Sequence, residues 1–338
     1  MSRNRLKAQR LTPVEAGDLW GRSDEASAFT QPECLEQLVD EVEWWGVERS
    51  GEIVAAWPLV RPVAGGEIGP PPFCYYVGPM FARDMRHRKY HRYWAIYSEA
   101  LAALISAVTA EHERLRFTLP LGITDVRVLQ WWNFDHPQQV GFSVTPRYTA
   151  RIDLSKLPDE SALLQSFSRS RRRTIEHWLT SPPAIIDGVD QDRVVELHDQ
   201  TLGRNGAVAD HARREALKRV LALANSGRGS SLGFIPRGER DVQAVIILLH
   251  GPTESSSIFR ASSPTWRSRG LAPWAVWHGL LLAKSLGKKW FDFNGANSPA
   301  RAADKHFFNA SAQLYFDCTF ARDGSWLDTS EPGEGGCL

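Results

Sequence analysis

The part of this chain best suited to chemistry lies between Ser262 and Asn309. It contains, in order, a loop of phosphate-binding type, a helix, a short strand and a second helix that carries Lys305. In the strand expected at residues 290–294, Asp292 and Asn294 share one face. Polar groups on a buried strand need partners, and a binding or reaction site is one way to supply them. The alternative is that they only cap neighbouring loops.

The loop at the start of this segment has the spacing R-x-x-G-x-A, formed by Arg267, Gly270 and Ala272, with Arg269 between them. Pro273 follows within the first helical turn, where its missing N–H costs nothing. A helix N-terminus offers free N–H groups and partial positive charge, and arginines add charge-assisted hydrogen bonds. The loop therefore predicts a pyrophosphate site, with an ordinary surface turn as the alternative.

Length and composition fit two domains of ordinary size, because the chain has 338 residues and 43% of them are hydrophobic. The net charge of +1 gives no general attraction for nucleic acid, and no DNA partner is expected. The four cysteines lack paired spacing and zinc-like histidine spacing, which predicts reduced thiols and no metal. No leader pattern and no stretch of membrane-spanning length is found, so a cytoplasmic protein is expected.

One order of elements occurs twice in the sequence. Helix, strand, proline-bearing loop, short helix and strand describe His91–Leu154 and also Pro273–Phe320. A duplicated α/β domain is the economical explanation, and chance similarity of two α/β units is the alternative. We expect domains at residues 1–155 and 156–322, followed by a flexible tail at 323–338. A strand is also expected at Phe73–Met80.

A helix expected at Asp159–Leu179 carries a cluster of arginines, and Arg171 falls on its apolar stripe. An arginine in that position must contact an anion. The anion is either part of a bound ligand or a carboxylate of the protein itself. Both interpretations stay open at this point.

Taken together, these segments resemble the FemAB-like transferases, a family with CelD/BcsL-like acetyltransferases and FemABX aminoacyltransferases. Five stretches carry the resemblance: YYVGPM at Tyr75–Met80, FTLP at Phe117–Pro120, SRSRRRTI at Ser168–Ile175, LLLAKSLGKKWFDF at Leu280–Phe293 and DKHFF at Asp304–Phe308. The resemblance extends over residues 43–320. It implies an α/β fold of two tandem GNAT-like domains, each a mixed sheet flanked by helices.

Two positions depart from the family pattern, because Asp304 stands where Phe is common and Asn309 where Gly is common. These departures affect the expected substrate contacts around Lys305. The loop Arg267–Ala272, by contrast, is closer to the coenzyme A loop of ordinary GNAT enzymes than in many FemAB-like members. The expected donor is therefore acyl-CoA, such as acetyl-CoA, acting as a co-substrate with no bound cofactor.

The resemblance implies amide formation by direct attack of an amine on an activated carbonyl. In that reaction Asp292 accepts the amine proton, directly or through water. Lys305 stabilises the oxyanion or binds an acceptor phosphate, and Tyr315 protonates a thiolate leaving group. The remaining expected site residues bind the substrates: Arg267, Arg269, Gly270 and Ala272 for the donor phosphates, and Arg171, Asn294 and Tyr76 for the acceptor.

The same resemblance allows an aminoacyl-tRNA-dependent, FemX-like transferase that acts on a peptidoglycan precursor or a small natural product. The basic stretch His87–Arg92 and the arginine helix would then contact a tRNA acceptor stem. A non-catalytic binding module is the third hypothesis, because a fold does not fix a function. The acceptor amine and the oligomeric state are left open.

Overall fold

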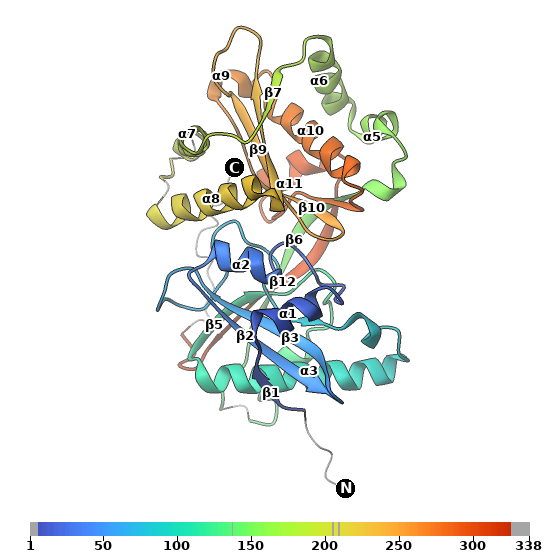
Figure 1. The fold of residues 1–338 in the computed structure, drawn as a ribbon, viewed down its shortest axis with the longest axis vertical. Coiled ribbons are helices and arrows are strands. Elements are labelled where there is room, and N and C mark those ends of the chain that lie inside the picture. Colours follow the sequence, from blue (N-terminus) through green and yellow to red (C-terminus); the bar gives the residue numbers. More distant parts are fainter. Residues whose placement is uncertain (1–5, 137, 205, 209, 326–338) are drawn as a thin grey trace. The chain divides into compact units, whose positions relative to one another are not determined.

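The computed structural model describes residues 6–136, 138–204, 206–208 and 210–325, which Figure 1 traces as a coloured ribbon. These residues form two compact units. The first contains the described residues up to Arg147 and those from Leu314 onward, and the second contains Tyr148–Gln313. The domains expected at 1–155 and 156–322 remain a prediction. Residues 326–338 of the expected tail lie outside the described part of the chain.

The first unit is built on an antiparallel sheet in the order β1-β2-β3-β4, and its β5 pairs with the end of β12. Ser50 and Gly51 join β2 to β3 with φ angles of 55° and 83°, the two positive values that a tight hairpin turn requires. The elements are β1 (Ala8–Arg10), α1 (Pro13–Trp20), α2 (Pro32–Leu38), β2 (Glu41–Arg49), β3 (Glu52–Arg61), β4 (Met80–Phe81), η1 (Arg83–Met85), α3 (Tyr90–Glu111), β5 (Arg114–Thr118), α4 (Arg127–Gln130) and, from Leu314 on, β12 (Ser311–Ala321).

The strand expected at Phe73–Met80 does not form, and only Met80–Phe81 pairs with β3 as β4. Phe73 and Tyr76 have φ angles of 69° and 59°, in the left-handed region that a strand excludes. The prediction was wrong because an apolar run is buried equally well by a turning backbone.

Helix α3 is long and apolar enough to cross a membrane, with 22 residues and a mean hydropathy of 1.2. No other helix in the described part of the chain passes this test. The expectation that no stretch reaches such a length was therefore wrong. In the structure α3 packs against β1, β2 and β3. Its buried residues explain the apolar composition: Ile96, Tyr97, Ala100, Leu101, Leu104, Ile105, Val108 and Thr109.

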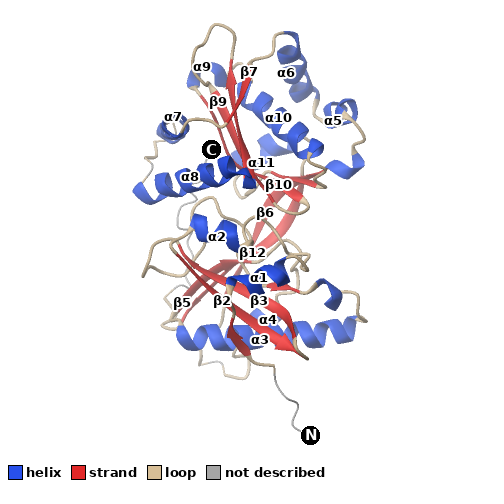
Figure 2. Cartoon of the chain, viewed as in Figure 1, coloured by secondary structure: helices blue, strands red, loops and turns tan. Residues whose placement is uncertain are grey.

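The second unit is built on a mixed sheet in the order β6-β11-β10-β9-β8-β7, in which only β10 and β11 pair in parallel. Helix α10 packs on β8, β9 and β10, and α7 also packs on β10 (Figure 2). The elements are β6 (Ser143–Asp153), η2 (Leu154–Lys156), α5 (Glu160–Ser166), α6 (Arg169–Thr180), β7 (Ala184–Asp187), α7 (Gln191–Gly203), α8 (His211–Leu223), the π-helix η3 (Ala224–Arg228), β8 (Gly229–Ile235), β9 (Ala244–His250), β10 (Glu254–Ser262), α9 (Pro264–Arg267), α10 (Leu271–Ser285), β11 (Trp290–Asp292) and α11 (Pro299–His306).

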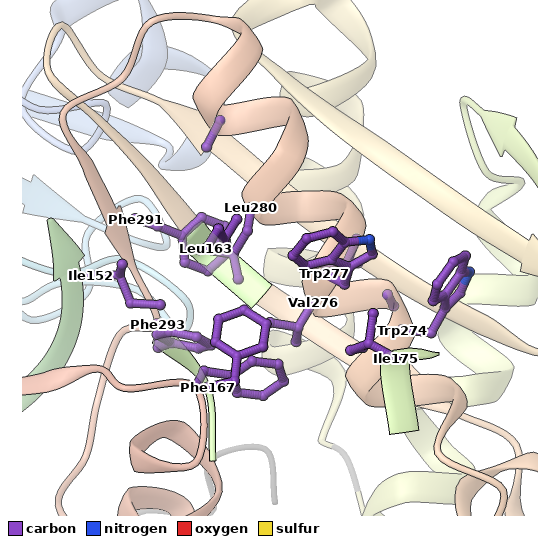
Figure 3. Close-up of a cluster of buried hydrophobic side chains, with 14 of the residues drawn as sticks. Ile152, Leu163, Phe167, Ile175, Trp274, Val276, Trp277, Leu280, Phe291 and Phe293 are labelled. Atoms are coloured by element: carbon purple, nitrogen blue, oxygen red, sulfur yellow. The ribbon is translucent and has the colours of Figure 1, made fainter. Parts of the chain in front are cut away.

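An apolar cluster around α10 forms the core of the second unit (Figure 3). Trp274 and Trp277 contribute from α10, and Phe291 and Phe293 contribute from β11 and the residue that follows it. Because Phe291 and Phe293 point into this cluster, Asp292 must project to the opposite face of the strand.

The helix expected at Asp159–Leu179 is two helices, α5 and α6, separated at Phe167 and Ser168. Ser168 caps α6, because its side chain accepts a hydrogen bond from the backbone N–H of Arg171. Phe167 has an extended backbone and lies edge-on to Trp277, with 5.9 Å between ring centroids. The break thereby places Phe167 in the core.

The two repeats expected from the sequence are present as α3-β5-α4-β6 and α10-β11-α11-β12. The last strand of each repeat pairs with a strand of the other repeat. Residues 151–153 of β6 pair with β11, and residues 317–321 of β12 pair with β5. The expected mixed α/β fold, with two sheets flanked by helices, is confirmed.

Helix α10 begins at Gly270, directly against α6. Gly270 has a left-handed φ of 79°, and a Cβ at this position would collide with Cγ2 of Thr174. Only glycine satisfies both demands. The packing of α6 on α10 thus explains this glycine without any ligand, and its expected role in donor binding stays a prediction.

Replacing Gly270 by alanine should lower the free energy of unfolding by on the order of 2–4 kcal/mol, through left-handed strain and overpacking. Gly203→Ala is the matched control, because nothing lies within 4 Å of a Cβ added to this residue of α7. The control should leave stability unchanged or raise it by up to ~1 kcal/mol. Urea denaturation measures both changes, and an unchanged midpoint for Gly270→Ala would contradict the packing described here.

Candidate active site

Strands β10 and β11 separate where the expected polar residues lie. Their parallel pairing joins Glu254–Ser256 to Trp290–Asp292 only, although β10 continues to Ser262. The pairing of β10 with β9 also shifts between residues 257 and 259, as at a β-bulge, which bends a strand. Backbone groups just beyond β11 are therefore not paired with β10 in a continuous set of strand hydrogen bonds.

Asp292 lies at this point with 1% of its surface exposed. Its Oδ1 accepts hydrogen bonds from Oγ1 of Thr149 at 2.6 Å and from the backbone N–H of Asn294 at 2.8 Å. Its Oδ2 is 3.5 Å from Nε of Arg151, the residue opposite it on β6. The strand expected at residues 290–294 ends at Asp292, and Asn294 follows it with a left-handed φ, so the two residues do not share the face of one strand. Asp292 joins β11 to β6.

Asn294 is buried, with 2% of its surface exposed and a left-handed φ of 50°. Its Nδ2 donates a hydrogen bond to the carbonyl of Ser257 at 3.2 Å and so spans the separation of the strands. Its Oδ1 is buried and has no hydrogen-bond partner among the residues that the structure describes. Backbone strain and an unsatisfied buried acceptor both cost free energy, and such features concentrate at functional sites.

Lys305 reaches the same point from α11 and is also buried. Its Nζ donates hydrogen bonds to the carbonyls of Asn294 and Gly295, so it holds the turn that follows β11. Burial, together with the positive charges of Arg260 and Arg301, lowers the pKa of Lys305 well below its ordinary value. A neutral amine can still donate to both carbonyls. The expected role of Lys305 at the oxyanion stays a prediction.

Asp304 is the carboxylate partner of Arg171 in this structure. Its two carboxylate oxygens accept hydrogen bonds from Arg171 and Arg260, each at 2.5 Å. Burial disfavours the charged carboxylate, but the two guanidinium groups outweigh that effect and hold the pKa of Asp304 below its ordinary value. The side chain of Arg171 therefore contacts a protein carboxylate in this structure. Its expected contact with an acceptor stays a prediction.

The residues expected to bind donor phosphates lie at the start of α10, and each has different neighbours. The guanidinium of Arg269 covers the ring of Trp266 at 4.7 Å. Arg267 lies near Arg204, where burial and the charge of Arg267 lower the pKa of Arg204. Ala272 is half-buried in the first turn. No side chain caps α10, so the positive end of its dipole is available to an anion.

Tyr76 and Tyr315 lie in the first unit, whereas Asp292 and Lys305 lie in the second. The two tyrosine rings meet edge to face with centroids 5.2 Å apart, and each residue is 5% exposed. This contact between the two rings was not predicted from the sequence. The expected roles of both tyrosines stay predictions.

Three residues of the polar cluster were missed in the sequence: Thr149, Arg151 and Arg260. The signal available for Arg260 was a charged residue within a strand of small and apolar residues. Thr149 and Arg151 are two positions apart on β6 and so share one face, which an alternating pattern can indicate. Among the residues that the structure describes, no group of three or more His, Cys, Asp or Glu could hold a metal ion.

The lowered pKa of Lys305 predicts a pH dependence of stability. Between that lowered value and 10.5 the unfolded chain binds a proton that the folded protein does not, so the free energy of unfolding rises with pH. In Lys305→Met this contribution is absent, and the rise should be shallower. Lys156→Met is the control, because the Lys156 side chain is 79% exposed. Urea titrations at several alkaline pH values measure the slopes, and equal slopes for Lys305→Met and wild type would refute the shift.

No family model and no curated protein matches this sequence. Among solved structures, FemX superposes with a TM-score of 0.66 at 13% identity, covering 92% of this chain and 96% of FemX. A tandem GNAT protein from the clavulanic acid biosynthesis pathway gives a TM-score of 0.54 at 12% identity, covering 94% and 99% of the two chains. L-PGS from Bacillus licheniformis gives 0.54 at 9% identity, covering 91% of each.

Identities this low establish a common fold and carry no information about substrates. The superpositions extend over nearly the whole of each chain, so they include both repeats. The chain therefore has the tandem GNAT fold of the FemAB-like proteins.

Proposed function

We propose that the protein is an N-acyltransferase. An acceptor amine attacks the carbonyl carbon of an activated acyl donor, the new C–N bond replaces the bond to the leaving group, and an amide is released. The fold supports this class of reaction, because the chain shares that fold with FemX and with a tandem GNAT protein. One local observation carries the proposal to particular residues. It is the buried, strained Asn294 with its unpartnered Oδ1, held between Asp292 and Lys305 where β10 and β11 separate.

In the proposed reaction the unpartnered Oδ1 of Asn294 accepts a hydrogen bond from the acceptor amine. This contact orients the amine lone pair toward the acyl carbonyl and satisfies an otherwise costly buried acceptor. Asp292 takes the proton that the nitrogen loses on attack, directly or through one water. No covalent enzyme intermediate is needed, because the donor arrives already activated.

Lys305 acts at the same point in two ways. It holds the carbonyls of Asn294 and Gly295 and so fixes the left-handed turn that presents Asn294. It is also the side chain proposed to stabilise the oxyanion on the acyl carbonyl, or to bind an acceptor phosphate. Negative charge that develops there favours the protonated amine, which has a third N–H to donate. When the leaving group is a thiolate, Tyr315 is the proposed proton donor.

The proposed donor is acyl-CoA. Its phosphates would lie at the uncapped, positive start of α10, with Arg267, Arg269, Gly270 and Ala272. The overall reaction would convert acyl-CoA and a primary amine into an N-acyl product and the free thiol of CoA. Arg171 is proposed to bind an anionic acceptor, whose negative group would replace the Asp304 carboxylate as its partner. Tyr76 is proposed to contact the acceptor.

A second candidate donor is aminoacyl-tRNA. The observation that favours it is the stretch His87–Arg92, in which all six side chains are exposed. A transferase that contacts only the end of a tRNA needs few phosphate contacts.

Asp292→Asn should lower turnover by roughly 10²–10⁴-fold, because the amide cannot accept the amine proton, while donor affinity is unchanged. Asn294→Ala should raise the KM for the amine more than it lowers kcat. Asp187→Asn on β7, outside the cluster, is the control and should behave as wild type. Thiol release from acetyl-CoA with a panel of primary amines measures turnover, and thermal melting checks folding. Wild-type turnover in a folded Asp292→Asn protein would exclude Asp292 as the base.

The two candidate donors predict different effects of salt on binding affinity. Acetyl-CoA should bind saturably, with an affinity that changes little between low and moderate salt. A charged tRNA pool should bind weakly or not at all, whereas a tRNA-dependent enzyme would lose affinity steeply as salt rises. Calorimetric titration of the wild-type protein at two salt concentrations distinguishes the two. If tRNA binds in a salt-sensitive way and CoA does not bind, aminoacyl-tRNA becomes the proposed donor. If neither donor binds and no turnover is found, the binding-module hypothesis is the one that remains.

A further inference from the structure

Exposed aromatic side chains gather at one place on the first unit, where α3 packs against α4 (Figure 2). Tyr90 is 65% exposed, Trp131 is 51% exposed and Phe134 is 75% exposed. Phe134 follows Trp131 within one hydrogen-bonded turn, and the half-buried Trp94 lies edge-on to Trp131 with ring centroids 6.3 Å apart. Single exposed apolar residues are ordinary, whereas a group of them marks an interaction surface. These four residues are called the aromatic surface below.

Arg127 holds three of the four aromatic residues in place. Its guanidinium lies over the rings of Trp94 and Trp131, at 4.1 and 5.4 Å from their centroids. It also donates a hydrogen bond to the hydroxyl of Tyr90 at 3.1 Å. Asp125 accepts two hydrogen bonds from the same guanidinium, at 2.8 and 2.5 Å. The rings are therefore ordered before a partner arrives, so docking costs little side-chain entropy.

Basic side chains continue directly from the aromatic surface. The stretch His87–Arg92 contains three arginine or lysine residues, two histidines and no acidic residue, and all six of its side chains are exposed. Tyr90 belongs both to this stretch and to the aromatic surface. Asp84 contacts Arg88 at 3.3 Å in an exposed ion pair, which water screens. The complementary partner carries negative charge directly beside apolar surface.

We propose that this surface docks the protein on an anionic lipid membrane. Lys89 and Arg92 attract the acidic headgroups. Trp131 and Phe134 enter the boundary between headgroups and acyl chains, where aromatic side chains are favoured. Tyr90 lies between the basic and the aromatic residues and suits the same boundary, because it has an apolar ring and a polar hydroxyl. The proposal does not rest on the proposed acyltransferase function.

Two other partners match this surface less well. In a two-fold dimer the same surface of each copy faces the other, so the basic stretches would meet like charges. A base of an RNA stacks on an open ring face, but Arg127 already covers one face of Trp94 and of Trp131. An anionic bilayer has neither difficulty, because it offers negative charge and apolar surface at adjacent depths.

The first test measures binding of the full chain to vesicles by flotation. Vesicles of phosphatidylcholine mixed with phosphatidylglycerol should bind the protein, and vesicles of phosphatidylcholine alone should bind it much less. Combining Lys89→Glu with Arg92→Glu should weaken binding to the mixed vesicles by about tenfold or more. The matched control combines Arg237→Glu with Arg240→Glu, the same charge change at two exposed arginines of the second unit. It should weaken binding by less than about threefold, because salt screens distant charges.

The second test asks whether aromatic side chains enter the bilayer. Phe134→Ala should weaken binding to the mixed vesicles roughly three- to tenfold, because less apolar area is covered. Val14→Ala is the control, because Val14 is also 75% exposed and lies on α1, outside the aromatic surface. Brominated acyl chains should quench tryptophan fluorescence. Trp131→Phe should reduce this quenching while binding changes by about twofold or less, because a ring is retained. Thermal melting checks that every variant is folded.

The proposal is overturned if the wild type binds neither kind of vesicle, or if the folded Lys89→Glu and Arg92→Glu double variant binds as wild type does. Unchanged binding of Phe134→Ala together with unchanged quenching in Trp131→Phe would also overturn it, because attachment would then be electrostatic only. An RNA hairpin that binds through the basic stretch, with no vesicle binding, would overturn it and favour the tRNA donor. Acetyl-CoA turnover is measured without vesicles, so the acyltransferase proposal fails or stands separately.

Discussion

The burial of α10 against its sheet fixes the rest of the second unit. Trp274, Trp277 and Leu280 from the helix and Phe291 from β11 meet in one apolar cluster. Each such side chain contributes about 1.5–3 kcal/mol on burial, whereas a single hydrogen bond contributes a net of about 0.5–1.5 kcal/mol. The apolar contacts therefore decide which face of β11 points inward. The polar residues take the other face as a consequence, and that face is where the candidate site forms.

In the second unit, two arginines and one aspartate form a charged cluster around Asp304. Arg171 lies on a helix stripe that is otherwise apolar, and Asp304 stands at a position where similar proteins commonly have Phe. The structure shows that these two unusual features belong together, because Asp304 holds both Arg171 and Arg260. A buried arginine without a carboxylate would be strongly destabilising, so neither residue is understandable alone.

Composition gives an incomplete account of the first unit. Helix α3 has the length and hydropathy of a membrane-spanning helix, yet it packs along the sheet formed by β1, β2 and β3. A lipid bilayer and a protein core both select apolar side chains, so hydropathy does not distinguish them. The aromatic run before β4 shows the same limit, because Phe73 and Tyr76 are buried on a backbone with positive φ angles.

Local patterns in the sequence determined the repeat order, the buried helix α10 and the outward face of Asp292 on β11. These features depend on helix and strand periodicity, which acts over a few residues and is visible in one segment. The family resemblance added the tandem GNAT fold, which the solved structures then confirmed.

Only the tertiary structure decided the partners. Thr149 and Asp292 are far apart in the sequence, as are Arg171 and Asp304. The exchange of β6 and β12 between the repeats and the collision that requires Gly270 are likewise non-local. A single sequence carries no record of such pairings, because they arise from how elements pack after each has formed. The polar residues of the site were therefore predictable by type and face, and their contacts were not.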